Sequence, residues 1–230
     1  MKNTLINRLA TLKVAKALDD LCEEVVFVGG AMVSLYIDDP YAEDIRPTKD
    51  IDVTFQITTA WELERIRILL NQKGFKEAAD SPVTCRFKYD DLPVDVMSTQ
   101  GIGWAPGNQW FSKGFDQAIP VLIDETKIKV LPLPYFLATK FDAFFHRGIK
   151  DVYASKDLED IVYLFNHTSE IVDQIVIATD DAGLYVRESV QRLMNDPIAM
   201  GAIPGHLFFE NADEQYQEIK QKFNKLAREL

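Results

Sequence analysis

The sequence predicts an α/β fold: a small mixed sheet with flanking helices, followed by an α-helical C-terminal region. Residues 1–131 combine amphipathic helical segments with short apolar or alternating runs that are typical of strands. After Pro132-x-Pro134, apolar residues recur at helical spacing up to the C-terminus. We therefore expect a sheet domain over residues 1–131 and a helical region over 132–230.

Composition and charge are those of an ordinary globular protein. The 230 residues are 47% hydrophobic and 27% charged, which allows one large or two small domains with a sizeable core. We expect no signal peptide, no membrane span, reduced thiols at Cys22 and Cys85, and hence a cytoplasmic setting. The net charge of −11 opposes broad non-specific nucleic-acid binding, which phosphate neutralisation drives. It leaves room for a local basic patch or a metal-screened nucleotide site.

The expected elements of the first half follow from periodicity and turn residues. Thr59-Ala60-Trp61-Glu62 forms a capping box, and Gly74 suits the position just past the end of the helix that it opens. Asp90-Asp91 joins two strands of a hairpin. In chain order we expect a helix over 4–21, a strand over 25–28, a helix-compatible segment over 31–37, an exposed loop over 38–46, a strand over 48–55, a helix over 60–74, and strands over 84–89 and 92–98.

The second half begins with a loop over 101–114 that is rich in glycine and large aromatic residues. Its rings could stack on a base or line an acceptor pocket, but we favour the interpretation that they tuck against the core. The remaining expected elements are a strand over 127–131 and helices over 134–147, 156–165, 170–194 and 211–230, with a Pro- and Gly-containing connection over 195–206.

Two aspartates share one face of the strand over 48–55. Successive side chains of a strand point to opposite faces, so Asp50 and Asp52 lie side by side and repel each other. A divalent cation between them explains their presence. If the hairpin strand over 92–98 lies beside them, Asp95 faces the pair and completes the oxygen-only shell that Mg²⁺ prefers. The alternative is three unrelated surface aspartates at strand ends.

The Gly29-Gly30 pair ends the strand over 25–28. Glycine lets a backbone approach a phosphate closely, and a following helix offers free N–H groups and a positive dipole end. The alternative is a tight strand-to-helix turn that binds no ligand.

In their order and spacing, Gly29-Gly30, Asp50-x-Asp52 and a later lone Asp95 resemble the signature of the DNA polymerase beta-like nucleotidyltransferase superfamily. The resemblance covers roughly the first half of the chain. It implies a sheet of the nucleotidyltransferase type, with the three aspartates holding two Mg²⁺ ions (or Mn²⁺) while a nucleoside monophosphate moves from ATP or another NTP to an acceptor, releasing pyrophosphate.

Many relatives carry Ser or Thr directly after the two glycines, where this chain has Ala31. One hydroxyl contact to phosphate would therefore be missing. Ser34, three residues further on, is a candidate substitute. The nucleotide is expected to lie in a cleft between the sheet domain and the helical region.

A narrower resemblance concerns the helical region. Lys140, followed by the run from Ser155 to Ile161 that contains Asp157 and Asp160, is similar to motifs of the abortive-infection (type IV) toxin nucleotidyltransferases and their uncharacterised relatives. This implies that Lys140 contacts nucleotide phosphates, that the two aspartates shape the site, and that a tRNA 3′ end and a protein antitoxin are candidate partners. The alternatives are a lysine that snorkels at a core margin and aspartates stabilised by a helix dipole.

Three other functions remain open. A small-molecule nucleotidyltransferase of the antibiotic-modifying kind would share every residue above and differ only in its acceptor pocket. The chain could instead be a nucleotide-binding regulatory module without turnover, or a protein–protein interaction module held by a partner. His167 and His206 have no partner at metal-ligand spacing, so we expect no zinc site. No P-loop, GxGxxG or Gly-x-Ser-x-Gly motif is present.

Overall fold

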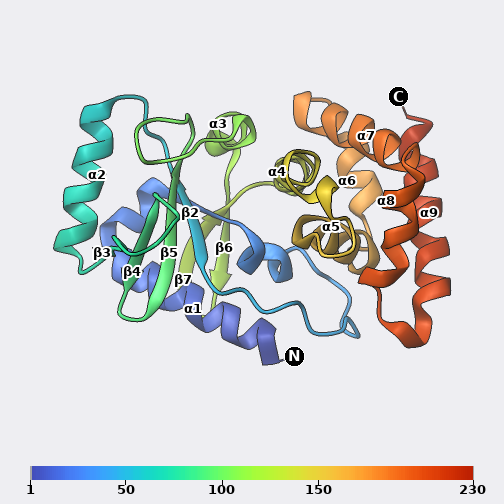
Figure 1. Cartoon of the computed structure of the whole chain (residues 1–230), viewed down its shortest axis with the longest axis horizontal. Helices are drawn as coiled ribbons and strands as arrows, with labels where there is room; N and C mark the ends of the chain where they lie inside the picture. Colours follow the sequence, from blue (N-terminus) through green and yellow to red (C-terminus); the bar gives the residue numbers. More distant parts are fainter. Residues whose placement is uncertain (1, 230) are drawn as a thin grey trace. The chain divides into compact units, whose positions relative to one another are not determined.

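The structure, a computed structural model of the chain, describes residues 2–229. The chain divides into two compact units, drawn in Figure 1. The sheet unit comprises Met1–Ser34 and Asp44–Pro132, and the helical unit comprises Leu35–Glu43 and Leu133–Leu230. A mixed sheet with helices is thus followed by a helical C-terminal region, and the α/β fold predicted from the sequence is confirmed.

Within residues 2–229 the strands form one seven-stranded sheet in the order β3-β4-β5-β2-β1-β7-β6. The pairs β1–β7 and β2–β5 are parallel and the other neighbours are antiparallel, so the sheet is mixed. Both central strands, β1 and β2, are largely buried, as expected for strands covered on two faces. The strands are β1 Val25–Val28, β2 Ile51–Phe55, β3 Lys76–Glu77, β4 Arg86–Tyr89, β5 Leu92–Ser98, β6 Ile119–Ile123 and β7 Thr126–Val130.

Local signals position the elements around the β4–β5 hairpin. Helix α2, Ala60–Gln72, begins with the predicted capping box, in which Thr59 accepts from the backbone of Glu62 and the Glu62 carboxylate accepts from the backbone of Thr59. Gly74 follows the helix with a φ of +89°, a conformation that glycine adopts without strain. Asp90 turns the hairpin with a φ of +51°, which aspartate tolerates better than most residues. These predictions are confirmed.

Helix α1, Lys2–Leu18, is shorter at its C-terminal end than the predicted 4–21, because the chain tightens into a 3₁₀ helix over Asp19–Glu24. Its apolar stripe is also less regular than predicted. Leu5 and Leu9 are exposed, whereas the residues that follow them along the stripe are buried.

Other boundaries in the sheet unit differ from the predictions. The strand predicted over 48–55 begins only at Ile51, and the helix-compatible segment over 31–37 is a 3₁₀ helix, Gly30–Leu35. Edge strands β3 and β6 were not predicted, because β3 has two residues and β6 contains a proline. The loop over 101–114 ends in a short helix, α3 Gln109–Gly114, whose Trp110 and Phe111 are buried, which confirms the favoured interpretation for those two rings.

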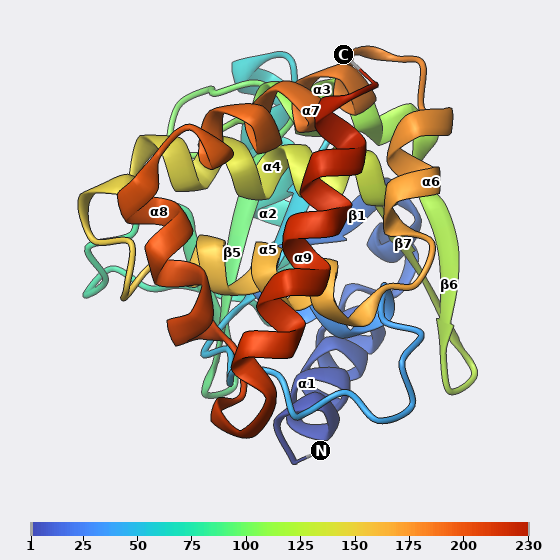
Figure 2. The ribbon, with the colours of Figure 1, turned by 90° about the vertical axis from the view of Figure 1, so that its right-hand side faces the viewer.

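The helical unit packs six helices, shown from a second direction in Figure 2. Helix α4 packs against α5 and α7, and α9 packs against the same two helices. None of the helices within residues 2–229 is both long and apolar enough to cross a membrane. The helices are α4 Leu133–His146, α5 Lys156–His167, α6 Ile171–Ile177, α7 Asp181–Met194, α8 Pro197–Ala202 and α9 Ala212–Ala227.

The single helix predicted over 170–194 is wrong, since α6 ends at Ile177 and α7 starts at Asp181. The break is made by Asp180, whose carboxylate accepts hydrogen bonds from the backbone of Ala182 and Gly183 and so caps α7. The connection expected over 195–206 likewise contains α8. By contrast, α5 begins at Lys156 as predicted, and Ser155 caps it by accepting from the Leu158 backbone.

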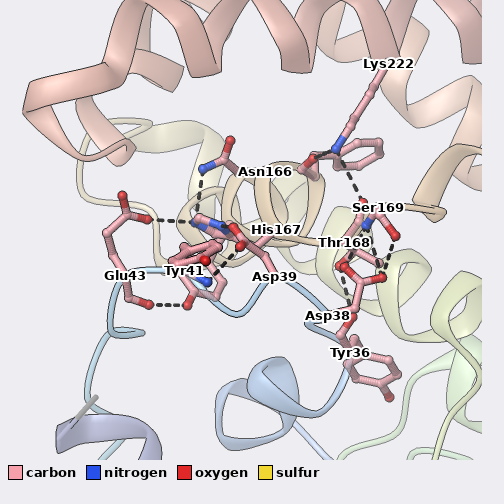
Figure 3. Close-up of polar contacts among 12 residues, drawn as sticks. Tyr36, Asp38, Asp39, Tyr41, Glu43, Asn166, His167, Thr168, Ser169 and Lys222 are labelled. Carbon is pink, nitrogen blue, oxygen red and sulfur yellow. Dashed lines mark hydrogen bonds and ion pairs between the residues drawn. The ribbon is translucent and has the colours of Figure 1, made fainter.

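The segment Leu35–Glu43 is bound to the end of α5 by polar contacts (Figure 3). His167 is buried, with Nδ1 2.8 Å from the Asp39 carboxylate and Nε2 3.0 Å from that of Glu43. The Asp38 carboxylate accepts from the hydroxyl and backbone of Ser169. The predicted exposed loop over 38–46 is therefore anchored through its acidic residues.

Candidate functional site

Strand register places the predicted carboxylates in one row across the sheet. Asp52 of β2 pairs with Asp95 of β5 in parallel register, so both side chains lie on the same face. Arg86 of β4 pairs with Asp95 on the other side, and Val28 of β1 pairs with Asp52. The expectation that the Asp95 strand lies beside the strand of Asp50 and Asp52 is confirmed.

Asp50 lies one residue before β2. Its carboxylate and that of Asp95 both accept hydrogen bonds from the Arg86 guanidinium. Arg86 Nε donates to Asp95 Oδ1 at 2.7 Å, and Nη2 donates both to Asp95 Oδ2 at 2.8 Å and to Asp50 Oδ2 at 2.6 Å. The side chains of Asp95, Arg86 and Asp50 are 12%, 22% and 32% exposed. Two of the three predicted aspartates thus converge on one nitrogen atom at a partly exposed position.

The carboxylates raise the pKa values of two neighbouring side chains. Hydrogen bonding to Asp95 raises the pKa of Arg86 further above its ordinary value. Burial, together with the negative charges of Asp95 and Asp52, raises the pKa of the Cys85 thiol to about 11. Both shifts indicate an anionic site that stabilises cations.

The oxygen donors at this site suit a divalent cation, but the Arg86 guanidinium takes up part of the position that a cation would need. Three carboxylates offer the oxygen ligands that Mg²⁺ and Mn²⁺ prefer. Among residues 2–229, however, no group of three or more His, Cys, Asp or Glu side chains is arranged so that it could hold a metal ion. The carboxylates of Asp50 and Asp95 are turned toward the guanidinium. The donor set is chemically suited to such a cation, while Arg86 Nε and Nη2 occupy three of its carboxylate oxygens.

The glycine pair lies directly against this row. Gly29 has a φ of +76°, and a Cβ built on it would lie 1.8 Å from Asp52 Oδ2. A Cβ on Gly30 would lie 2.4 Å from Nη2 of Arg46. No other residue type fits either position without displacing a charged side chain, so the two glycines are explained by close approach of the backbone to these charges.

The Ser34 side chain is buried on the 3₁₀ helix that follows. Within the described residues its hydroxyl makes no hydrogen bond. A buried hydroxyl without a partner is uncommon and calls for a specific explanation.

The sequence-predicted residues of the helical unit are held by ion pairs within that unit. Lys140 Nζ lies 2.8 Å from Asp160 Oδ2, and both side chains are buried. Asp157 accepts two hydrogen bonds from the Arg147 guanidinium, at 2.8 and 2.9 Å. The structure therefore brings Lys140 and Asp160 together and pairs Asp157 with Arg147, which is the last residue of the helix predicted over 134–147.

Sequence reasoning missed two basic residues, Arg86 and Arg46. The pairing of Arg86 with Asp95 could have been predicted from the hairpin, because counting back from the Asp90-Asp91 turn places the two residues opposite each other. Arg46 lies in an irregular stretch, where no periodicity indicates which residue its side chain meets.

Comparisons with known proteins give little beyond this geometry. No protein-family model matches the chain, and no curated protein matches it. One matching crystal structure is that of an antigenic nucleotidyltransferase-like protein from Paracoccidioides brasiliensis. It is 17% identical, the alignment covers 86% of this chain and 93% of that one, and the TM-score is 0.49. A likeness of this degree leaves the function to be argued from the site itself.

Proposed function

We propose that the chain is a metal-dependent nucleotidyltransferase that moves a nucleoside monophosphate from an NTP to an acceptor and releases pyrophosphate. One observation carries the proposal. Asp52 and Asp95 are register partners on adjacent strands, Asp50 and Asp95 both accept from the Arg86 guanidinium, and Gly29 leaves no room for a side chain against Asp52. Asp52 and Asp95 of this carboxylate cluster lie on interior strands of the sheet, and a site on strands is held more precisely than one on loops.

In this proposal Asp50, Asp52 and Asp95 hold Mg²⁺ or Mn²⁺. When bound, the cation lowers the pKa of the acceptor hydroxyl and neutralises charge on the triphosphate. The acceptor oxygen forms a bond to the α-phosphorus, the bond from that phosphorus to the bridging oxygen breaks, and pyrophosphate leaves. Asp95, already an acceptor of hydrogen bonds from Arg86, takes the proton of the acceptor hydroxyl.

In this proposal the Gly29-Gly30 turn binds the phosphates of the nucleotide. The backbone at Gly29 and Gly30 carries no side chain that would block a phosphate, and the Ser34 hydroxyl is available to donate a hydrogen bond. Lys140, Asp157 and Asp160 stay predictions as nucleotide-site residues. Their ion pairs supply a structural role that needs no nucleotide.

A second function is favoured by a specific observation. The Arg86 guanidinium already neutralises part of the charge of Asp50 and Asp95. A site whose positive charge comes from the protein's own arginine could bind a nucleotide without transferring its nucleoside monophosphate. A non-catalytic nucleotide-binding regulatory module is therefore the alternative. The acceptor, whether a tRNA 3′ end or a small molecule of the antibiotic type, and an antitoxin partner stay predictions.

The test measures pyrophosphate release and transfer of label from each α-labelled NTP, with Mg²⁺ or Mn²⁺ and total cellular RNA. We expect release that needs the divalent cation and is abolished in Asp52→Asn, which keeps the size of the side chain and removes its charge. Asp91→Asn, in the exposed hairpin turn, is the matched control and should behave as the unchanged protein. Label in a tRNA-sized band supports the tRNA acceptor, and label only in small molecules supports the antibiotic type. Nucleotide binding without release supports the regulatory module.

A further inference from the structure

Arg86 uses the carboxylate oxygens that a divalent cation would need. Its Nη2 joins Asp50 Oδ2 to Asp95 Oδ2, and its Nε holds the other oxygen of Asp95. All three contacts are 2.8 Å or shorter, as expected for hydrogen bonds between charged groups. An oxygen lone pair directed at an N–H is not available to a metal at the same time.

Charge explains why a cationic side chain belongs there. Asp50, Asp52 and Asp95 carry like charges; Asp52 and Asp95 lie on one face of the sheet, Asp50 shares Arg86 Nη2 with Asp95, and Asp95 is buried. Without a counter-charge, these carboxylates would repel each other. Arginine stays charged at any relevant pH, and its planar fork matches the two oxygens of Asp95. The arginine therefore holds the carboxylates of Asp50 and Asp95 together.

We propose that Arg86 is a positioning residue that competes with the divalent cation for Asp50 and Asp95. It keeps the two carboxylates together until a cation binds, and it gives up the Asp50 contact when the cation arrives. This inference rests on the proposed function, because it assumes that the cation binds at the three aspartates. Arg86 then sets the cation concentration above which the site fills.

The experiment measures Mn²⁺ affinity by electron paramagnetic resonance of free Mn²⁺, using the full-length protein and its Arg86→Gln and Arg86→Lys variants. Loss of hydrogen bonds between charged groups should raise the affinity of Arg86→Gln at least about tenfold. Arg86→Lys should lie between Arg86→Gln and the unchanged protein, because one ammonium cannot form the two-pronged contact. A residue that merely supported the fold would lower the affinity when replaced.

Arg67→Gln is the matched control, since Arg67 of α2 forms surface ion pairs with Glu64 of the same helix and Glu77 of β3, and its loss should leave Mn²⁺ affinity unchanged. A second readout is the melting temperature. The metal-free Arg86→Gln protein should melt below the unchanged protein and gain more from added Mn²⁺.

The outcomes separate the two proposals. If the unchanged protein binds Mn²⁺ and releases pyrophosphate while neither Arg86 variant binds Mn²⁺ more tightly, the Arg86 inference is overturned and the proposed function stands. If no form of the protein binds Mn²⁺, the metal site fails and the inference fails with it.

Discussion

The ammonium group of Lys140 lies 2.8 Å from the carboxylate of Asp160, and the two side chains are only 7% and 3% exposed. Nζ also lies 5.2 Å from the ring centre of Phe136, within range of a cation–π interaction. The pair joins α4 to α5 inside the helical unit. Each charge is therefore compensated in a place where an uncompensated one would be costly.

Breaking this pair should destabilise the protein strongly. We expect Lys140→Met to lower the free energy of unfolding by about 3–5 kcal/mol, because it removes the cation that is paired with a buried carboxylate. The double variant Lys140→Met with Asp160→Leu should recover most of the loss, since apolar side chains of similar size can replace a buried ion pair. Urea unfolding measures both.

Lys225→Ala is the matched control, because Lys225 and Asp173 are 59% and 63% exposed in their ion pair and its loss should cost less than about 1 kcal/mol. A Lys140→Met protein as stable as the unchanged one would contradict the prediction. The stable double variant also separates folding from activity, so it tests the predicted phosphate contact of Lys140 directly.

Gly29→Ala should damage both stability and activity. The added Cβ would overlap Asp52 Oδ2, and a φ of +76° is strained for alanine. Strain of this kind costs about 1–3 kcal/mol, to which the displacement of Asp52 adds. Thermal unfolding and pyrophosphate release should both show the loss.

Gly201→Ala, where an added Cβ meets nothing within 4 Å, should be neutral or stabilising by less than about 1 kcal/mol. Equal behaviour of the two glycine variants would count against a close approach between Gly29 and Asp52.

The contact between His167 and Asp39 should make the anchoring of Leu35–Glu43 sensitive to acid. The hydrogen bond with His167, assisted by the Tyr41 backbone, lowers the pKa of Asp39 below its ordinary value of 3.8. A lowered carboxyl pKa contributes stability that is complete above the ordinary value and is lost as the pH falls through the lowered one. Titration by NMR should show Asp39 returning toward its ordinary pKa in His167→Gln.

Hydrogen exchange gives an independent readout of the same contact. In His167→Gln the backbone amides of Leu35–Glu43 should exchange faster at neutral pH. Asp173→Asn, which removes an exposed ion pair with Lys225, is the control and should leave this exchange unchanged. Unaltered exchange in His167→Gln would show that the remaining contacts, among them that of Asp38 with Ser169, anchor the segment without His167.

Cys85 should react slowly with alkylating reagents until the pH is high. Burial, then the charge of Asp95, raises its pKa from 9.0 to about 11, and the thiolate is the reactive form. In a Cys22→Ser background, the alkylation rate followed by mass spectrometry should rise with a midpoint near pH 11. Because the folded-state pKa is raised, the associated stability is complete below pH 9 and is lost as the pH rises toward 11. A midpoint near 9 would contradict the shift.

The carboxylate row was predictable because it follows from strand alternation and a hairpin turn, both short-range features. Asp52 and Asp95 needed only the assumption that their strands are neighbours, which the parallel β2–β5 pairing confirms. Arg86 escaped notice because a basic residue on an edge-side strand looks like ordinary solvated surface until its cross-strand partner is considered. The site roles of all these residues stay predictions.

The sequence analysis failed at a local helix cap and at a long-range ion pair. The break between α6 and α7 depends on Asp180 acting as a cap, and Gly183 packs so closely that a Cβ there would lie 2.0 Å from the Ala178 carbonyl oxygen. The periodicity of the segment continues across the break, so it indicates a single helix. The partner of Lys140 was likewise hidden, since twenty residues separate it from Asp160.

The chain leaves the sheet unit after Ser34, enters the helical unit until Glu43, returns, and leaves again after Pro132. Neither unit is therefore a continuous stretch of polypeptide. A fragment cut at Pro132 would contain residues 35–43 without their partners His167 and Ser169. The complementary fragment would contain His167 and Ser169 without the nine-residue segment that they bind. Dissection of this protein requires a spliced design that deletes or transplants residues 35–43, and co-expressed halves cut at 132 should reassemble poorly.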